Sequence, residues 1–390
     1  MKIRVDKTGI YKLSYADLKN MGFSDPSKVS VHGYGGWPLD EDFSKEYIDD
    51  VPSTPVWRGS DYLLFYGKGP VKWEYDSSSQ TFVHTNNPYS LYGYYFVTDA
   101  TPTNDMTSVA QASGASTRIT TYDDYLLHEQ ELVSVNQSGR EFFGEDFSGA
   151  RPRTISTFSS IPGITDADGK VTMRFISRIN SGSGTASLSI NDSELLDITI
   201  PSIQTVSSNV RSYTKAIPGT TTALWKGSKS EKNNVVVSYS SSGHTNVRLD
   251  YIRMQFVRTL RPYGASTFFR SLTSVGNASR FVISEANSNT LVFDVTDALN
   301  VKRVEADLNG SELSFTIPAG RLREFVLVQT NQTFPSPEVV GEVASSNLHG
   351  LEQRDMIIIS APSLVQQAER LAVAHREKDG LTVEVVTPEA

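Results

Sequence analysis

The sequence predicts a mainly β protein in which two or three antiparallel domains of sandwich or jelly-roll type precede the first βαβ unit of a truncated α/β domain. Three observations lead to this prediction. Short runs of alternating apolar and polar residues recur between turn residues from position 2 to about position 330. Helical periodicity is scarce over the same residues. A strand, a helix and a second strand then follow one another within residues 355–390.

Residues 1–115 are expected to form an N-terminal β-rich domain. Residues 2–5 and 10–14 alternate on either side of a turn, which predicts a hairpin. Residues 15–22 predict a short helix that Gly22 ends. Further strands are predicted at residues 29–31, 61–67 and 94–98.

Residues 120–260 are expected to form a β-sandwich of jelly-roll type. Residues 100–120, rich in Thr, Ser and Ala, are interpreted as the linker before it. A short helix is predicted at 122–131, and a turn-rich aromatic stretch at 138–147. Strands are predicted at residues 171–176, 185–190, 197–200, 234–239 and 247–257, and turn residues separate several of them.

Residues 261–340 continue the same pattern, with strands predicted at 280–283, 290–294, 301–306, 313–317 and 324–328. Periodicity leaves two interpretations open. The segment is either a small third sandwich or the second sheet of the preceding domain. Pro335 and Pro337 mark a boundary after it.

Residues 341–390 are interpreted as the start of an α/β domain. Residues 355–360 and 381–386 are predicted strands, with Ser363 as the N-cap of the helix between them and Gly380 at its end. The predicted apolar face of the helix comprises Leu364, Ala368, Leu371, Ala372 and His375. Two strands and one helix cannot cover both faces of a parallel sheet, so the domain is expected to be truncated and to lie loosely on the preceding one.

Composition excludes several classes of function. The net charge of -8 argues against nucleic acid or an anionic membrane as the principal partner. The chain has no cysteine, so it holds no disulfide, thiolate metal site or cysteine nucleophile. It also has no apolar run long enough to span a membrane and no signal-peptide core after Met1. Either the protein is cytosolic or a leader lies upstream of Met1.

No metal site is predicted, although three kinds of residue were candidates. The six histidines, at positions 32, 84, 128, 244, 349 and 375, show no ligand spacing and are interpreted as solvated or capping residues, with His375 structural. Asp166-Ala-Asp-Gly169 lacks the later acidic ligand of a calcium loop and is interpreted as a hairpin turn. Asp40–Asp42 with Asp49 and Asp50 is interpreted as an acidic surface loop.

No catalytic or cofactor site is predicted either. The glycines of His32-Gly-Tyr-Gly-Gly36 are interpreted as a tight turn with positive φ, because neither a helix nor a P-loop lysine follows them. Tyr92, Tyr94, Tyr95 and Phe96 fit a half-buried strand better than a sugar-stacking patch. The Asn-x-Ser/Thr triplets at Asn136, Asn191, Asn277, Asn309 and Asn331 are attributed to chance. We find no combination of nucleophile, base and orienting residue.

Several stretches resemble the N-terminal region of the gingipain family of cysteine peptidases, and within it the type IX secretion sortases. They lie at residues 2–13, 87–96, 138–145, 249–252, 294–297 and 347–350. Ser138-Gly-Arg-Glu-Phe-Phe-Gly-Glu145 is an example. Residues 355–362, 368–371 and 379–385 resemble the first strand, first helix and second strand of the peptidase domain. The order and spacing of these stretches make the resemblance specific.

The resemblance implies an outer-membrane or cell-surface protein, exported through the periplasm, that removes sorting domains from secreted cargo and helps to attach that cargo to the surface. Secretion-system components and cargo are the partners it implies. The catalytic His and Cys of the family lie beyond Ala390, so no residue here inherits a catalytic role. The β-rich region is expected to act as a scaffold, a docking surface or a cover resembling a propeptide.

A different class of function stays open at this stage. The β domains are also compatible with a cell-surface module that binds carbohydrate or protein, with the C-terminal βαβ unit belonging to another enzyme. A downstream His and Cys, after further βα units, would favour the peptidase interpretation.

Overall fold

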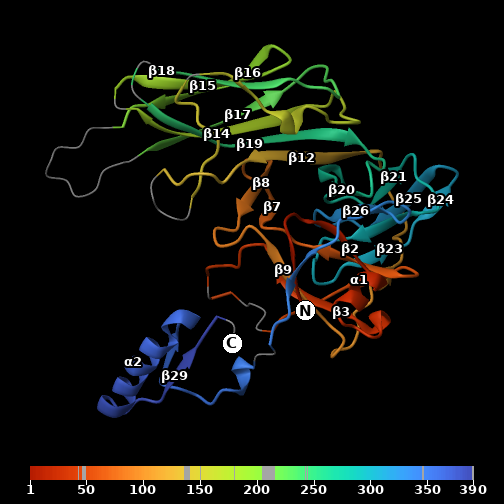
Figure 1. Cartoon of the computed structure of the whole chain (residues 1–390). Coiled ribbons are helices and arrows are strands. Elements are labelled where there is room, and N and C mark those ends of the chain that lie inside the picture. Colours follow the sequence, from red (N-terminus) through yellow and green to blue (C-terminus); the bar gives the residue numbers. More distant parts are fainter. Residues whose placement is uncertain are drawn as a thin grey trace. The chain divides into compact units, whose positions relative to one another are not determined.

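The structure is a computed structural model that describes the chain except for residues 43, 46–49, 136–140, 150, 180, 204–215, 242, 244, 345–346 and 389–390. The chain divides into a larger unit, Ile3–Glu338, and a smaller one, Val339–Ala390 together with Met1–Lys2. Figure 1 shows strands throughout the larger unit and one long helix in the smaller. The predicted mainly β class is confirmed.

The larger unit is organised around a nine-stranded sheet of order β10-β23-β22-β26-β20-β12-β19-β14-β17. In chain order its strands are β10 (Ser108–Val109), β12 (Thr121–Glu129), β14 (Gly169–Ile179), β17 (Ile217–Trp225), β19 (Thr245–Thr259), β20 (Ser266–Arg270), β22 (Thr290–Asp294), β23 (Lys302–Val304) and β26 (Glu324–Gln329). Its two ends contribute to two separate hydrophobic cores, so this one sheet takes part in two sandwiches.

The first sandwich joins the β12-β19-β14-β17 end to a sheet of order β13-β18-β15-β16. The strands of this sheet are β13 (Arg153–Thr154), β15 (Ser183–Ile190), β16 (Ser193–Pro201) and β18 (Val235–Ser241), and η2 (Ser156–Phe158) follows β13. Ala186, Leu188 and Ile190 point inward along β15 and meet Met173 and Phe175 of β14 in one core. A spacing of two residues buries one face of each strand.

The second sandwich joins the β20-β26-β22-β23 end to a sheet of order β11-β21-β25-β24. This sheet contains β11 (Thr117–Ile119), β21 (Ser279–Ile283), β24 (Asp307–Asn309) and β25 (Glu312–Ile317), and η3 (Leu272–Ser274) precedes β21. Phe269, Phe281, Phe315 and Phe325 fill its core, where Phe281 and Phe315 stack with ring centres 5.2 Å apart. These four rings contact one another, and aliphatic side chains complete the core.

The first hundred residues form smaller sheets of order β1-β9-β3-β4, β2-β6-β5 and β7-β8. Their strands are β1 (Lys2–Val5), β2 (Gly9–Ser14), β3 (Ser30–Gly35), β4 (Ser53–Thr54), β5 (Val56–Arg58), β6 (Tyr62–Gly67), β7 (Val71–Asp76), β8 (Thr81–Asn86) and β9 (Gly93–Thr98), with helices α1 (Tyr15–Asn20) and η1 (Pro26–Lys28). Ser14 caps α1 through Asp17 N at 3.0 Å, and Gly22 has a φ of +99° after it, as predicted.

The N-terminal strands cover the second face of the nine-stranded sheet at its β22-β26 end. Ile10 of β2 and Tyr66 of β6 share a core with Phe293 of β22 and with Val326 and Val328 of β26. Both faces of this end are therefore buried, which explains why Glu324–Gln329 is an almost continuous apolar run.

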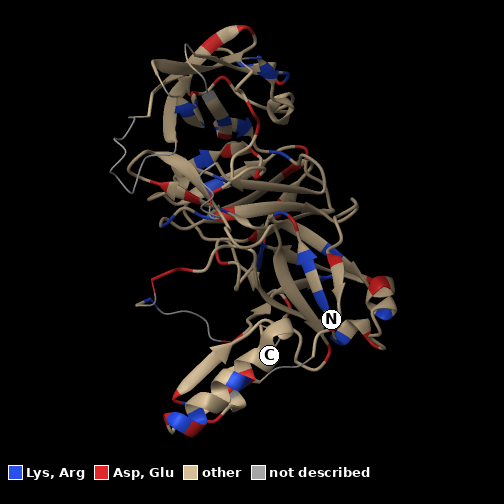
Figure 2. Ribbon diagram, turned by 60° about the vertical axis from the view of Figure 1, so that its left-hand side comes forward, with Lys and Arg blue, Asp and Glu red and all other residues tan. Residues whose placement is uncertain are grey.

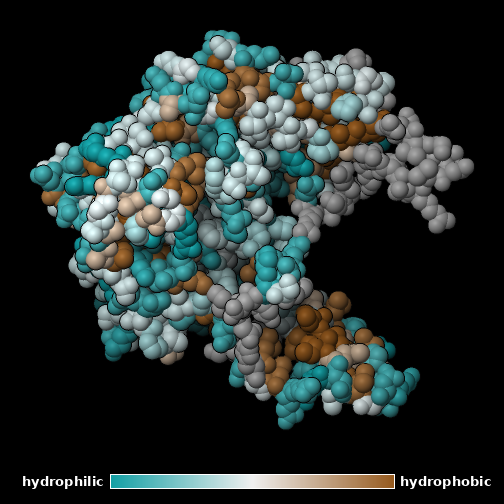
Figure 3. Space-filling view, turned by 180° about the vertical axis from the view of Figure 1, so that it is seen from behind, coloured by the Kyte–Doolittle hydropathy of each residue, from teal (hydrophilic) through white to brown (hydrophobic). Residues whose placement is uncertain are grey.

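The smaller unit ends in a strand, a helix and a strand, β28, α2 and β29. It contains β27 (Glu338–Gly341), η4 (Leu348–Gly350), β28 (Met356–Ile359), η5 (Pro362–Leu364), α2 (Val365–Lys378) and β29 (Val383–Val386). β28 and β29 pair in parallel, and Gly380 has a φ of +70° after the helix, so the predicted βαβ unit is confirmed. Ala372 and Val383 are buried, whereas the side chains of Ile357 and Ile359 are 59% and 75% exposed. Figure 3 shows hydrophobic side chains at the surface of this unit.

Within the described ranges, no helix has the length and apolar character needed to cross a membrane. Figure 2 shows acidic and basic residues interspersed over the ribbon rather than separated into faces of one sign. This distribution agrees with the modest net charge of the sequence.

The predicted hairpin of residues 2–5 and 10–14 is wrong in its pairing. Both strands form, but β1 neighbours β9, whereas β2 pairs with β6 from Gly9–Gly67 to Ser14–Tyr62. The Tyr11 hydroxyl of β2 donates to O of Lys7, which lies in the turn between the two strands, at 2.9 Å. The long ladder to β6 outweighs the local tendency to pair.

Two further predictions between residues 100 and 131 are wrong. The predicted linker contains β10 and β11, which pair in parallel with β23 and β21. The predicted helix at 122–131 is β12, which pairs with β19 at nine consecutive positions. Tertiary pairing overrides a weak local preference here. The sequence analysis also did not predict the strands β4, β5, β7, β8, β13, β17, β20, β24 and β27.

Ser363 is not the N-cap of the long helix. It lies inside η5, and Leu364 occupies the N-cap position without a side-chain hydrogen bond. The predicted apolar face is also only partly correct, because Leu364 and Leu371 are more than half exposed while Ala372 is fully buried. Pro362 favours the tight turn that displaces the start of the helix.

We predict that Phe315→Ala lowers the free energy of unfolding by about 3–5 kcal/mol, because Phe315 is fully buried and stacked on Phe281. Leu308→Ala is the matched control, since Leu308 is 42% exposed on the neighbouring strand β24. Denaturant titration of both variants measures the difference. Equal losses would show that the aromatic core is not what stabilises this sandwich.

We also predict that backbone amides of β28 exchange with solvent faster than those of β14. β28 has β29 as its neighbour in a two-stranded sheet, and its Ile357 and Ile359 are exposed, whereas β14 is flanked by β17 and β19. Hydrogen exchange followed by mass spectrometry of peptides 355–360 and 171–179 measures this. Strong protection of 355–360 would contradict the prediction.

Candidate functional site

The candidate site is a cleft of about 440 Å³ in the larger unit, where the N-terminal strands meet β12, β20 and β26. Its lining is aromatic and charged. The aromatic residues are Trp37, Tyr66, Trp73, Tyr122, Tyr125, Tyr263 and Phe268, and the charged ones are Asp6, Lys7, Asp124, Arg258, Arg270 and Glu324. A concave, mainly apolar surface with a few charged groups is the usual form of a ligand site.

Arg270 lies buried at one wall of the cleft. Its side chain is 3% exposed, and its Nη2 lies 2.6 Å from Glu324 Oε1. Glu324 faces Arg270 directly across the β20–β26 ladder, and Asp123 faces it across the β12–β20 pairing. Arg270 Nη1 donates to Asp123 O at 3.1 Å. Cross-strand register therefore brings the donor and its acceptors together.

Electrostatics hold Arg270 in its charged form. Burial by itself lowers the pKa of Arg270, but the carboxylates of Glu324 and Asp124 outweigh burial and keep that pKa above its usual range. The guanidinium also lies over the Tyr125 ring, 4.3 Å from its centre. A charge buried in this way costs several kcal/mol when its partner is removed.

A second guanidinium, that of Arg258, forms a neighbouring part of the wall. Arg258 Nη1 lies 2.8 Å from Asp124 Oδ2, and Arg258 Nε donates to Pro162 O at 2.8 Å. The guanidinium lies 3.8 Å from the centre of the Tyr263 ring. The Asp124 carboxylate thus lies between two cations, because its other oxygen is 3.7 Å from Arg270 Nη1.

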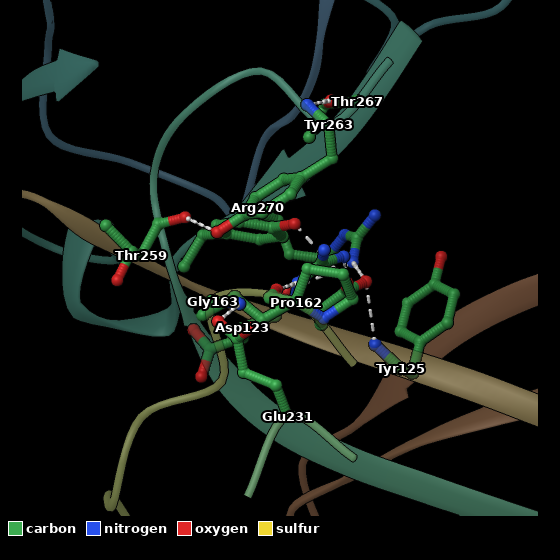
Figure 4. A network of polar contacts seen from close by, with 12 residues as sticks. Asp123, Tyr125, Pro162, Gly163, Glu231, Thr259, Tyr263, Thr267 and Arg270 are labelled. Carbon is green, nitrogen blue, oxygen red and sulfur yellow. Dashed lines mark hydrogen bonds and ion pairs between the residues drawn. The ribbon is translucent and has the colours of Figure 1, made fainter. Parts of the chain in front are cut away.

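Backbone and hydroxyl contacts fix the ring of Tyr263. Its hydroxyl donates to Thr259 O at 2.9 Å, and its backbone N–H donates to Thr267 Oγ1 at 2.7 Å (Figure 4). Gly163 passes beneath the ring, where a Cβ atom would lie 1.7 Å from the Tyr263 hydroxyl. Only glycine fits at this position, because the Cβ atom of any other residue would overlap the Tyr263 hydroxyl.

The opposite wall comes from the hairpin β7–β8. Trp73 of β7 stacks on Tyr125 of β12 with ring centres 4.0 Å apart, and Phe82 of β8 lies beside the same tyrosine at 5.3 Å. Gln255 Oε1 accepts from Phe82 N at 2.9 Å, which joins the hairpin to β19. Aromatic stacking and one buried amide thus position this wall.

Close backbone packing holds Trp37 at the rim. Gly35, with a φ of +76°, and Gly36 precede Trp37, and Gly36 N donates to Lys68 O at 2.8 Å. The positive φ predicted for these glycines is confirmed at Gly33 and Gly35, but the predicted tight turn is instead the bulged end of β3. Lys68 Nζ lies 5.1 Å from the centre of the Trp37 ring.

The histidines are distributed over separate places. His84 pairs with Glu129 at 3.1 Å and is only 5% exposed, so the predicted solvated state is wrong for it. His32 lies beside Ser30 and Thr101, and His375 bonds Asp379 at 2.6 Å. His244 and the side chain of His349 lie outside the described residues. Within the described ranges, no three His, Cys, Asp or Glu side chains form a group that could hold a metal ion.

His128 joins a hydroxyl to a carboxylate. Thr157 Oγ1 lies 2.8 Å from His128 Nδ1, and Glu145 Oε1 lies 2.7 Å from His128 Nε2. These residues come from β12, η2 and the segment between them, and no spacing in the sequence indicates that they lie close together. The imidazole is 11% exposed. We interpret the arrangement as a link between three segments, because it buries two polar side chains with partners.

The acidic candidates are surface features. Asp40 pairs with Lys45 at 2.5 Å, which lowers the pKa of Asp40, while Asp49 lies outside the described residues. Asp166 accepts from Lys229 N at 2.8 Å. The predicted hairpin turn at residues 166–169 is wrong, because the strand that follows, β14, pairs with β17 and β19 rather than with a preceding strand.

The aromatic run at 92–96 is a half-buried strand, as predicted. Tyr95 is 1% exposed, and its hydroxyl accepts from Lys68 N at 2.7 Å. Tyr92 lies on the other face, where the Arg4 guanidinium is 4.0 Å from its ring centre. The triplet at Asn136 lies outside the described residues.

Comparison with solved structures finds a strong match to PorU. Latent, dimeric PorU from Porphyromonas gingivalis superimposes with a TM-score of 0.86 and 34% sequence identity, over 99% of this chain and 37% of that one. The chain thus spans little more than a third of the length of the PorU chain it matches.

Two further structures are similar only at a level that carries no argument. They are an insecticidal delta-endotoxin from Bacillus thuringiensis (TM-score 0.19, 9% identity, 58% of this chain and 41% of that one) and a cycloisomaltooligosaccharide glucanotransferase from Paenibacillus (TM-score 0.18, 8% identity, 56% and 45%). No protein-family model matches the chain, and no curated protein does.

We predict that Glu324→Gln lowers the free energy of unfolding by about 1–3 kcal/mol, because the amide keeps an acceptor oxygen but removes the nearest anion of the buried Arg270 guanidinium. Glu312→Gln is the matched control, since Glu312 and its partner Arg118 are both more than half exposed, and a change within about 0.5 kcal/mol is expected. Denaturant titration distinguishes them. Equal effects would show that the pair at Arg270 behaves as a surface pair.

The partly buried Lys68 makes the free energy of unfolding depend on pH. Burial lowers the pKa of Lys68 to about 8, so the native state binds fewer protons than the unfolded one between about pH 8 and 10.5. Its burial therefore costs stability below pH 8, and this cost disappears as the pH rises to 10.5. We expect Lys68→Met to raise the free energy of unfolding by about 1 kcal/mol at pH 7 and to have little effect at pH 10.5. The same gain at both pH values would contradict the assigned cause.

Proposed function

Since the chain is PorU-like over 99% of its length, we propose that it is the non-catalytic N-terminal part of a type IX secretion sortase of the gingipain family. The observation that supports this is the superposition with a TM-score of 0.86 on latent PorU. In this role the β-rich unit is a scaffold that presents docking surfaces to the secretion machinery and to cargo. The residues that cleave the cargo belong to another part of the protein.

The chain's own residues support a role without catalysis. A cysteine peptidase needs a thiolate nucleophile, and the sequence has no cysteine. We propose that residues 341–390 begin the α/β peptidase domain, because β28, α2 and β29 form a parallel βαβ unit. The exposed Ile357 and Ile359 then face further elements of that domain.

The same proposal places the protein at the outer membrane or cell surface after export through the periplasm. Its partners there are secretion-system components and cargo that carries a C-terminal sorting domain. Scaffold surfaces of this kind need a rigid platform, and the continuous nine-stranded sheet with two cores supplies one.

We predict that the purified chain hydrolyses no peptide bond. Incubation with an unfolded protein substrate, with and without a cysteine-peptidase inhibitor, measures this. Inhibitor-sensitive cleavage would overturn the assignment of catalysis to another part of the protein. The coding sequence after Ala390 provides an independent check, since further βα units that carry a His and a Cys are expected there.

Docking is tested by competition. The chain is produced in excess and exported in a cell that secretes cargo. We expect it to occupy docking sites on the secretion machinery and to slow the removal of sorting domains by the full-length protein. The Phe315→Ala variant, whose second core is weakened, is the matched control. Unchanged processing, with the wild-type chain present at the same location, would contradict a docking role.

A further inference from the structure

The cleft has the composition of a binding site for an uncharged ligand. Three cations, Lys7, Arg258 and Arg270, and three anions, Asp6, Asp124 and Glu324, line it. The charges are paired with one another at Arg258–Asp124 and Arg270–Glu324. A cleft whose charges balance in this way does not select a strongly charged ligand.

The tyrosine side chains of the cleft carry neutral hydroxyl groups rather than phenolate anions. Burial raises the pKa of Tyr66, Tyr122 and Tyr125 well above its usual range, so each hydroxyl stays protonated at neutral pH. Tyr66 and Tyr122 are almost fully buried, and the Tyr125 ring is covered by Trp73 and the Arg270 guanidinium. The apolar character of the walls therefore rests mainly on the other aromatic lining residues, Trp37, Trp73, Tyr263 and Phe268. A ligand that is apolar on its faces and polar at its edges fits such walls.

Two buried donors of lining residues lack a hydrogen-bond partner among the described residues. Trp37 Nε1 and Arg270 Nε have no hydrogen-bond partner in the part of the chain that the structure describes, although each atom is buried. Arg270 as a whole is 2% exposed. A buried donor without an acceptor costs about 1–3 kcal/mol, and an acceptor on a ligand would recover that cost. The cleft therefore favours a ligand rich in hydrogen-bond acceptors.

We propose that this cleft binds a neutral oligosaccharide. Sugar rings have apolar C–H faces that pack on aromatic rings, and their hydroxyl and ring oxygens accept hydrogen bonds at the edges, which matches both features of the wall. The volume of about 440 Å³ lies in the range of small-ligand pockets and accommodates a short saccharide. The proposal concerns this cleft alone and does not depend on the scaffold role.

The test is titration of the whole chain, labelled with nitrogen-15, with neutral trisaccharides. The four tryptophans give four indole N–H signals, of which Trp37 and Trp73 lie in the cleft lining while Trp57 and Trp225 do not. Maltotriose, cellotriose and mannotriose are each added to about 10 mM, a concentration that detects millimolar binding. At least one is expected to shift the Trp37 and Trp73 signals in a saturable way and to leave those of Trp57 and Trp225 in place.

A substitution at Trp37 then tests the contribution of its Nε1–H donor. Trp37→Phe keeps an aromatic ring and removes the Nε1–H group, and we expect it to weaken trisaccharide binding by about tenfold. Trp225→Phe, in the core of the first sandwich, is the matched control and should bind as the wild type does. Unchanged Trp57 and Trp225 signals in Trp37→Phe show that this variant is folded.

Three outcomes would overturn the proposal. The first is that none of the three trisaccharides shifts the cleft signals. The second is binding that Trp225→Phe weakens as much as Trp37→Phe does. The third is that a proline-rich peptide saturates the same signals while the trisaccharides have no effect, which would make the cleft a peptide groove.

Discussion

The buried guanidinium of Arg270 is the interaction on which the arrangement of the larger unit depends. It lies where β20 meets β12 on one side and β26 on the other, and Asp123 and Glu324 face it across those two pairings. Because a buried cation is tolerated only with close anions, the three strands must keep this register. The ion pair thereby fixes the point at which one sandwich passes into the other.

That point is also where the cleft forms. β12 continues from Asp123 along β19 into the first sandwich, and Tyr125 on the same strand supports Trp73 of the hairpin β7–β8. The hairpin is thus held on the sheet by aromatic stacking beside a paired charge. Structure and candidate binding surface share the same residues, so the cleft is as rigid as the sheet junction beneath it.

Much of the fold followed from local pattern. Residues 185–190 alternate strictly because one face of their strand is buried, residues 171–176 are mostly apolar because β14 is largely buried, and both strands formed where predicted. The helix at 122–131 failed because nine pairings with β19 decide its conformation. The cleft could not be predicted, since its lining extends along the chain from Asp6 to Glu324 and no spacing between such residues is visible in the sequence.

The sequence by itself determined the β-rich class, the terminal βαβ unit and the absence of a thiol, because periodicity, glycine position and composition are local properties. Only the tertiary structure decided which strands pair, that one nine-stranded sheet takes part in two cores, and that Arg270, Asp124 and Glu324 meet. Strand pairing is long-range, and its register depends on the burial of whole faces rather than on neighbouring residues.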